Sequence, residues 1–205
     1  MPEELQKLIG GILTKTKKGS RVIIAISGFG GSGKTTLAKQ LEKELPDAAV
    51  ISVDDFIIRS KFSERTDHWN SIDWLRLIEQ VLSSFKNAGT VNYQVYDWQA
   101  DNLDTWRTIL QKRFLIIESV GLLQPLLLPY FDYSVWIDYP FESAMKRGME
   151  RDKARFSADN IHLWESRKKL WEEVWIPNDR EYFAKHRPDT WADFVYHPEI
   201  KHSLK

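Results

Sequence analysis

The sequence predicts an α/β fold in which a parallel sheet of five strands carries helices on both faces, and two observations lead to it. Short runs rich in β-branched residues alternate along the chain with segments whose apolar residues recur at helical spacing. The first run, Val22 to Ile26, contains no polar residue, which is typical of a strand buried on both faces. The 205 residues show no internal repeat and no low-complexity linker, so we expect a single domain over residues 1–205.

The elements are expected in the following order. Residues 1–19 form a helix and a polar turn, because apolar residues from Leu5 to Ile12 share one helical face. The strands are expected at residues 21–26, 50–53, 114–117, 133–137 and 194–196. Helices are expected at residues 37–45, 72–85, 141–151 and about 159–175. Pro46 ends the first of these, since proline lacks the amide hydrogen that a helix interior needs.

The composition excludes several classes of protein. The chain has 29 basic and 29 acidic residues, nine tryptophans and no cysteine. Without cysteine, neither a disulfide scaffold nor a zinc site built on thiolates is possible. The formal charge of zero argues against broad electrostatic binding of a nucleic acid polymer, and the five histidines show no metal-binding spacing. Any anion that the chain binds is therefore expected at a local site.

The apolar runs are too short to span a membrane. Residues 114–117 and 126–128 are among the longest, far below the roughly 20 residues that cross a bilayer. The N-terminus is acidic from Met1 to Glu4 and lacks a basic region followed by an apolar one, so a secretory signal is not expected. We expect a cytoplasmic protein without a membrane partner.

A glycine-rich loop directly after the first strand is the strongest chemical signal in the sequence. Residues 28–35, GFGGSGKT, match G-x-x-x-x-G-K-[ST], the pattern of a phosphate-binding loop between a strand and a helix. The backbone amides of such a loop converge on phosphate oxygens, and the following helix N-terminus adds positive potential. Lys34 is expected on the β- and γ-phosphates and the Thr35 hydroxyl on Mg²⁺; a glycine turn without ligand is the alternative. The residues expected to bind the nucleotide are Gly28, Phe29, Gly30, Gly31, Ser32, Gly33, Lys34, Thr35 and Thr36.

Carboxylates follow two of the expected strands, at the edge of the sheet where ligands of open α/β folds bind. Asp54 and Asp55 follow the second strand. One is expected to orient and deprotonate a substrate hydroxyl, while its neighbour, on the other side of an extended chain, faces metal or water. A solvated or helix-capping pair is the alternative. Glu118 follows the third strand, where an acidic residue holds Mg²⁺ through water.

With these residues, the sequence resembles the uridine kinase-like branch of P-loop kinases. This branch includes uridine–cytidine kinases, nicotinamide riboside kinases, phosphoribulokinases and bacterial pantothenate kinases. The likeness covers about residues 20–196 and is carried by the segments Gly33 to Lys39, Val50 to Phe56, Asp67 to Asp73 and Val95 to Trp98. The first two are especially close to nicotinamide riboside kinases, and the last two are similar to segments of uridine kinases. The resemblance implies a P-loop sheet of strand order 2-3-1-4-5, with ATP and Mg²⁺ as cofactors.

The resemblance also implies roles for residues around the acceptor. Asp54 would be the catalytic base and lie close to the metal, and Asp67 would bind the hydroxyls of a ribose. Asp55 and His68 are further substrate-binding candidates, although His68 fits an ordinary loop hydrogen bond equally well. Tyr96 and Trp98 would lie beside the base, where stacking stabilises binding; aromatic residues at this spacing also occur in cores.

A basic segment follows the fourth strand. Its cations are Lys146, Arg147, Arg151, Lys153 and Arg155. The three arginines recur every four residues and share one face of a continuous helix, which a solvated surface would also explain. The resemblance implies a small helical lid at residues 141–160, with Arg151 as a catalytic residue and Arg147 and Arg155 at the substrate. Trp164, Trp171 and Trp175 recur at helical spacing further along, which favours helix packing over ligand contact.

The sequence predicts an ATP-dependent kinase that moves the γ-phosphate to a primary hydroxyl of a small metabolite, with the 5′-hydroxyl of a nucleoside as first choice. Two departures leave the acceptor open, since Asp101 stands where uridine kinases carry histidine and Trp69 where they carry proline. Nicotinamide riboside or pantothenate is an alternative acceptor, and a non-catalytic nucleotide-binding regulator is the alternative of another class. A GTP switch is disfavoured because the chain lacks an [NT]-K-x-D motif. Association into a homo-oligomer stays open.

Overall fold

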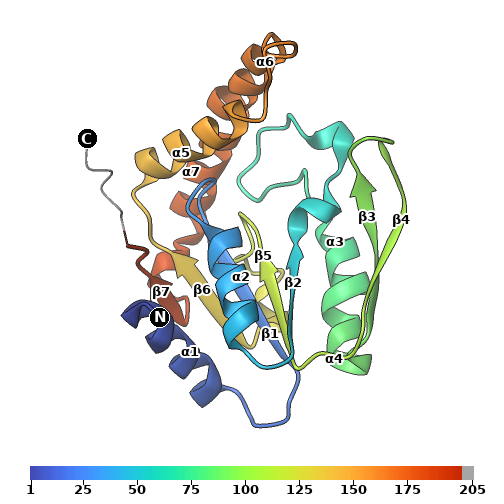
Figure 1. The fold of residues 1–205 in the computed structure, drawn as a ribbon, viewed down its shortest axis with the longest axis vertical. Helices are drawn as coiled ribbons and strands as arrows, with labels where there is room; N and C mark the ends of the chain where they lie inside the picture. The colour runs from blue at the N-terminus through green and yellow to red at the C-terminus, as the bar shows by residue number, and fades with distance from the viewer. Residues whose placement is uncertain (200–205) are drawn as a thin grey trace.

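The computed structural model describes residues 1–199, and its centre is a parallel sheet of five strands (Figure 1). The strands are β1 (Val22–Gly28), β2 (Ala48–Ser52), β5 (Phe114–Glu118), β6 (Tyr133–Ile137) and β7 (Phe194–Tyr196). They lie in the order β2-β5-β1-β6-β7. Counted along the chain, this is the predicted order 2-3-1-4-5, which is confirmed together with the α/β class.

The helices also follow the predicted alternation, with longer C-terminal elements than expected. They are α1 (Glu3–Lys15), α2 (Lys34–Glu44), α3 (Trp74–Leu77), α4 (Ser84–Ala88), α5 (Phe141–Lys153), α6 (Leu163–Leu170) and α7 (Ile176–His186). A wider, π-helical stretch at Ile78–Ser83 joins α3 to α4, and another at Trp171–Trp175 joins α6 to α7. In residues 1–199, none of the helices has both the length and the apolar character needed to cross a bilayer.

The sequence did not predict a small antiparallel ribbon beside the main sheet. Strands β3 (Val91–Asp97) and β4 (Asn102–Ile109) form it, next to α3 and α4 at the right of Figure 1. Val91, Tyr93 and Val95 are buried on one face of β3, whereas β4 is largely exposed. Only β3 alternates buried and exposed residues, so the hydrophobic pattern of the ribbon is weak in the sequence. The pairing of β3 with β4 is decided by the tertiary structure.

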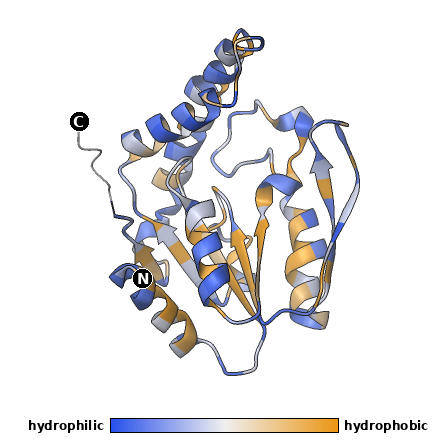
Figure 2. Cartoon of the chain, in the orientation of Figure 1, coloured by the Kyte–Doolittle hydropathy of each residue, from blue (hydrophilic) through white to orange (hydrophobic). Residues whose placement is uncertain are grey.

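The alternation of side chains along the sheet divides the hydrophobic core into two layers. Ile24 and Ile26 face α1 and α2, whereas Ile23 and Ala25 face α3, α4, α5 and α7. Figure 2 shows hydrophobic residues concentrated in the central strands and polar ones on α5 and α6. Because both faces are covered, ligands can reach the sheet only at its edges.

The parallel register brings the ends of three strands to one edge of the sheet. Glu118, the last residue of β5, is paired with Ile26 of β1 and with Ser52 of β2. The glycine-rich loop leaves β1 at this edge, and a short 3₁₀ turn at Val53–Phe56 leaves β2 beside it. The edge therefore gathers the residues from which a site can be built.

Helix α1 packs against the sheet through a glycine, which allows a test of this packing with a matched pair of substitutions. A Cβ at Gly11 would lie 2.4 Å from the Oη atom of buried Tyr133, whereas a Cβ at Gly10 would meet nothing within 4 Å. We expect Gly11→Ala to lower the free energy of unfolding by about 1–3 kcal/mol through overpacking. Gly10→Ala should raise it by about 0.5–1 kcal/mol, because alanine favours the helix.

Chemical denaturation of the two variants beside the unmodified chain measures both effects. Equal stability of the two variants would contradict the close contact between α1 and Tyr133.

Candidate functional site

A cavity of about 860 Å³ lies at the carboxyl edge of the sheet. Its walls come from several parts of the chain. These are the P-loop, the ends of β2 and β5, helix α5, some residues between Phe62 and Ile72, and the π-helical stretch at Trp171–Trp175. This volume falls in the range that holds small ligands and cofactors in proteins, about 300–1,000 Å³.

The glycine-rich loop forms one wall, and two of its glycines are required by its geometry. Gly31 has a φ of +81° and lies so close to α5 that a Cβ would be 2.2 Å from the carbonyl oxygen of Ala144. Gly33 has a φ of +104°, a left-handed conformation that side chains disfavour, and it directly precedes α2. The loop therefore exposes its backbone to the cavity, as binding of phosphate through amide groups requires.

Lys34 and Thr35 begin α2 and are linked to the loop and to β5. The buried Lys34 Nζ donates hydrogen bonds to the carbonyl oxygens of Gly28 (3.0 Å) and Phe29 (2.8 Å). Burial lowers the pKa of this ammonium, and the charge of Glu118 opposes that shift. The Thr35 hydroxyl donates to Glu118 Oε1 at 3.1 Å. Burial raises the pKa of Glu118, and the charge of Lys34 opposes the increase.

Asp54 lines the same cavity, together with Arg147 and Arg151 of α5 and with Arg155. Helix α5 ends at Lys153, so Arg155 lies in the turn after it and not on one continuous helix with the other two arginines. Asp54 lies on the 3₁₀ turn after β2, where its side chain is exposed to solvent. Arg147 lies near the P-loop, since a Cβ at Gly33 would be 3.7 Å from its Nη2 atom. Arg151 and Arg155 both approach buried Asp152, at 3.7 Å and 3.5 Å. The structure thus brings together Asp54, Glu118, Lys34, Thr35 and the three arginines that the sequence singled out.

Asp55 differs from this expectation, because it does not line the cavity. Its Oδ2 atom accepts hydrogen bonds from Arg107 (2.9 Å) and Tyr93 (3.2 Å), which lie on the β3–β4 ribbon. Burial raises the pKa of Asp55. Burial is also the main reason why the pKa of the Tyr93 phenol is raised to about 12. Asp55 therefore ties the ribbon to the sheet edge, on the side opposite Asp54.

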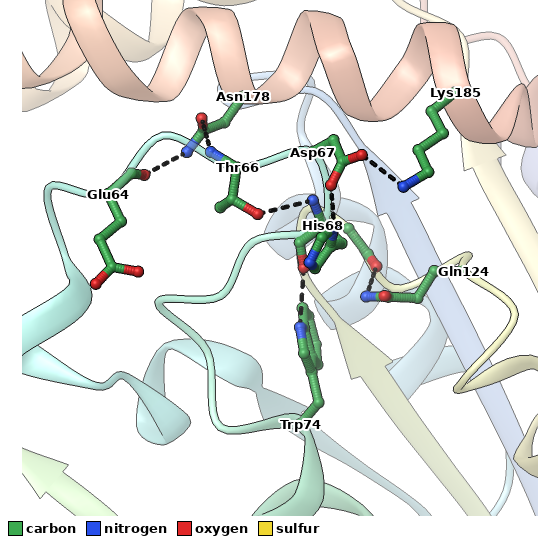
Figure 3. A network of polar contacts seen from close by, with 9 residues as sticks. Glu64, Thr66, Asp67, His68, Trp74, Gln124, Asn178 and Lys185 are labelled. Atoms are coloured by element: carbon green, nitrogen blue, oxygen red, sulfur yellow. Dashed lines mark hydrogen bonds and ion pairs between the residues drawn. The ribbon is translucent and has the colours of Figure 1, made fainter.

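Asp67 and His68 also lie outside the cavity lining. Figure 3 shows the Asp67 carboxylate directed toward Lys185 of α7, and it also contacts His68. Asn178 of α7 accepts a hydrogen bond from the amide of Thr66 (2.8 Å) and donates one to the carbonyl of Glu64 (3.1 Å). Residues 64–68 are thus held against α7, and neither Asp67 nor His68 lines the cavity.

Trp69 lines the cavity in place of these two residues. It has a φ of 54°, an unusual value for a bulky residue, and its indole is buried. A Cβ at Gly121 would lie 2.9 Å from this ring, so glycine at that position makes room for the indole. The turn at Trp69 separates the segment anchored to α7 from the cavity wall.

Of the expected aromatic pair, Trp98 lines the cavity and Tyr96 does not. The two rings pack edge to face at 5.0 Å, and the Tyr96 hydroxyl contacts Asp101. The wall continues from Trp98 to Phe62 at 5.5 Å and from Phe62 to Trp175 at 5.1 Å. A register shift in β3 between Val95 and Asp97 breaks the strict alternation, so the two side chains are not equivalent.

Two of the three tryptophans expected to pack helices also contribute to the cavity, whereas Trp164 packs against Phe156 and does not. The ring of Trp171 covers both the P-loop and α5. A Cβ added at Gly30 would lie 3.2 Å from this ring, and a Cβ added at Gly148 would lie 2.6 Å from it. Its indole nitrogen donates to Asp152 at 3.0 Å. Trp171 and Trp175 line the cavity, with their rings 5.2 Å apart. Helical spacing correctly indicated packing, but it carried no information on the ligand side of these rings.

Asp179 is a residue of the site that sequence reasoning missed. It belongs to α7, is 2% exposed, and accepts a hydrogen bond from the amide of Gly30 at 2.7 Å. Burial raises the pKa of this carboxyl to about 6, and the Gly30 hydrogen bond and the charge of Lys34 oppose the shift. No motif marks this aspartate, because it lies in an ordinary amphipathic helix far along the chain from the loop it contacts.

The donors near Thr35 fit a magnesium–nucleotide complex better than a resident metal. Within residues 1–199, no group of three or more His, Asp or Glu side chains is arranged to bind a metal ion. Mg²⁺ commonly takes one or two protein oxygens and completes its shell with waters and phosphate oxygens. The Thr35 hydroxyl beside the Glu118 carboxylate matches that requirement.

The chain is similar in sequence and in fold to known proteins. The model of the phosphoribulokinase/uridine kinase family matches residues 23–166. A uridine kinase from Shewanella amazonensis is 31% identical over 148 residues, which cover 65% of this chain and 69% of the relative. A uridine kinase from Haemophilus influenzae shows the same identity and coverage. A structure described as a possible uridine kinase from Bacillus stearothermophilus has a TM-score of 0.72 at 22% identity, with 95% of this chain and 97% of that one covered. At that identity the structural likeness shows the fold alone.

The buried carboxyl of Asp179 predicts a specific pH dependence of stability. Because its pKa is raised on folding from 3.8 to about 6, the folded chain binds this proton more tightly, and the stabilisation is lost as the pH rises through about 6. Relative to Asp179→Asn, which keeps an acceptor for the Gly30 amide, the unmodified chain should lose about 3 kcal/mol between about pH 4 and pH 7.

Urea denaturation of both chains across this pH range, without nucleotide, measures the difference. A difference in the free energy of unfolding between the two chains that stays constant with pH would contradict the raised pKa of Asp179. Asp179→Ala separates charge from hydrogen bonding, since it leaves the Gly30 amide unpaired at a cost of about 1–3 kcal/mol at every pH.

Proposed function

The chain belongs to the phosphoribulokinase/uridine kinase family, and we propose that it transfers the γ-phosphate of ATP to a primary hydroxyl of a small metabolite. The acceptor that we propose first is a nucleoside, phosphorylated at its 5′-hydroxyl. The observation that carries the proposal is the common cavity in which the P-loop, Asp54, Glu118 and the α5 arginines meet. Phosphoryl transfer depends on positioning and on stabilisation of charge, and these residue types supply both.

The P-loop and Lys34 bind the phosphates in this proposal. The ammonium of Lys34 is buried and bonded to carbonyl oxygens, which are weak partners for a desolvated cation. Phosphate oxygens are stronger acceptors, so the nucleotide gains from a charge that is already desolvated and held in place. Backbone amides at Gly31 and from Gly33 to Thr36 add further donors, whereas those of Gly30 and Ser32 already donate to Asp179 and to the carbonyl of Phe29.

Asp54, rather than Asp55, acts as the base. Asp54 lines the cavity and is exposed, so a substrate hydroxyl has access to its carboxylate. Asp55 is engaged by Arg107 and Tyr93 and faces away. Asp54 therefore accepts the proton from the acceptor hydroxyl as the oxygen attacks the γ-phosphorus, and the leaving group is ADP.

Thr35 and Glu118 would hold the magnesium ion, with Asp54 close to it. When bound, the metal neutralises negative charge on the β- and γ-phosphates. Arg151 of α5 adds a guanidinium to the transferring phosphate, and Arg147 of α5 and Arg155 in the turn after it extend the positive charge over the acceptor. Asp152 lies between Arg151 and Arg155 and limits where their side chains can move.

One observation favours a second group of acceptors. Asp67, the residue proposed for the ribose hydroxyls, contacts Lys185 and does not line the cavity. Pantothenate has no ribose and is therefore the second candidate that this observation favours. Nicotinamide riboside carries a ribose, so it stays an alternative that rests on the resemblance alone. Incubation with Mg-ATP and each of these acceptors, followed by detection of ADP and of the phosphorylated product, distinguishes the candidates. ATP binding without transfer to any acceptor would favour a non-catalytic regulator instead.

The role of Asp54 predicts a separation of binding from transfer. Asp54→Asn cannot accept a proton, so kcat should fall by about 10²–10⁴-fold while the Kd for Mg-ATP stays within about threefold. Asp104→Asn, on exposed β4 and outside the cavity lining, is the matched control and should keep full activity. Transfer assays with the best acceptor and calorimetric titration of nucleotide measure the two quantities. Unchanged kcat in Asp54→Asn would refute the assignment of the base.

A further inference from the structure

Arg167 of α6 places a guanidinium in the cavity wall that the transfer mechanism does not use. The side chain is half-buried and lies over the rings of Trp175 (5.3 Å) and Phe62 (5.7 Å). Cation–π contacts of this kind orient a guanidinium and leave its N–H groups free to donate in the plane of the group. The edge of Arg167 is thus available to a ligand.

Arg167 makes no ion pair within residues 1–199. The acidic group that favours its charge most is Asp152, which is already approached by Arg151, Arg155 and the Trp171 indole. Arg59 and Arg155 lie near and repel it, and burial lowers its pKa. A half-buried charge that forms no ion pair is partly desolvated at some cost, and a bound anion offsets that cost.

The position of Arg167 separates it from the phosphate-binding end of the cavity. Trp171 is the ring that touches the P-loop, and Trp175 lies one step further along the wall, toward Phe62 and Trp98. Arg147 is the cation next to Gly33. Arg167 lies over Trp175 and Phe62, in the part of the aromatic wall that leads away from the P-loop.

We propose that Arg167 binds an anionic group on the acceptor, so that the substrate class is an alcohol that carries an oxyanion remote from the hydroxyl to be phosphorylated. A carboxylate or a phosphate ester supplies this chemistry, because both present paired oxygens to the edge of a guanidinium. The aromatic wall of Phe62, Trp98 and Trp175 provides flat surfaces for the remainder of the acceptor. The inference rests on the proposed function, because the hydroxyl is the one that the kinase phosphorylates. Binding of the anionic group by Arg167 does not depend on that transfer.

Matched pairs of acceptors that differ in one anionic group test the proposal. The pairs are uridine and orotidine, nicotinamide riboside and nicotinic acid riboside, panthenol and pantothenate, and uridine and uridine 3′-monophosphate. The first three test a carboxylate and the last a phosphate ester. Titration calorimetry in the presence of magnesium and a non-hydrolysable ATP analogue gives the Kd of each member, whether or not phosphate is transferred.

In at least one pair, the member that carries the carboxylate or phosphate should bind the unmodified chain about 10-fold to 100-fold more tightly than its partner without that group. Arg167→Gln should reduce that ratio to about twofold or less and leave the Kd for Mg-ATP within about twofold. Lys168→Gln is the matched control, since this neighbouring cation is paired with Glu172 at 3.6 Å and does not line the cavity. It should keep the full ratio.

Three results would overturn the proposal: no anionic member binds more tightly than its partner, the ratio survives in Arg167→Gln, or Arg167→Gln weakens Mg-ATP binding as much as acceptor binding. The last result would assign Arg167 to the nucleotide. An Arg167-dependent preference without transfer to any acceptor would support the anion site and contradict the kinase. Transfer to neutral acceptors alone, at unchanged rate in Arg167→Gln, would support the kinase and contradict the anion site.

Discussion

The close approach of the glycine-rich loop to α5 is the constraint on which the rest of the site depends. Gly31 lies against the backbone of Ala144 and Gly148, with no room for a Cβ on the loop. The same short distance lets Trp171 cover both Gly30 and Gly148, and it brings Asp179 of α7 to the Gly30 amide. The glycine-rich loop, α5 and α7 are thereby packed together, so Arg147 and Arg151 of α5 are fixed relative to the loop.

At the sheet edge, buried ionisable side chains influence one another's pKa values. Burial shifts Lys34, Glu118 and Asp179 toward their neutral forms, and the opposite charges among them counter each shift. None is held by a close, fully compensating ion pair in residues 1–199. Such an arrangement costs stability, because buried charges lose hydration that the opposite charges only partly replace. The net charge of zero thus conceals strong local fields of both signs.

On the other side of the cavity, α7 binds the polar residues 64–68, and none of these residues lines the cavity. Asn178 and Lys185 hold residues 64–68 against the helix, and the chain then turns at Trp69. The wall that results is aromatic, with Arg167 as a cation that no described carboxylate pairs. This part of the cavity therefore presents flat aromatic surfaces and one guanidinium, whereas Asp67 and His68 lie outside its lining.

The sequence by itself determined the α/β class, the strand order through the family resemblance, and the phosphate-binding loop, because these depend on local patterns: buried β-branched runs, glycine spacing and helical period. It also indicated the residues that follow strand ends, such as Asp54 and Glu118, since parallel strands bring their carboxyl ends to one edge. Only the tertiary structure decided which side chains of a correctly located segment face the ligand. Asp54 and Asp55 are neighbours that diverge, Asp67 contacts a lysine 118 residues away, and Asp179 meets a loop 149 residues away. Contacts over such separations depend on how helices pack on the sheet, which no local pattern records.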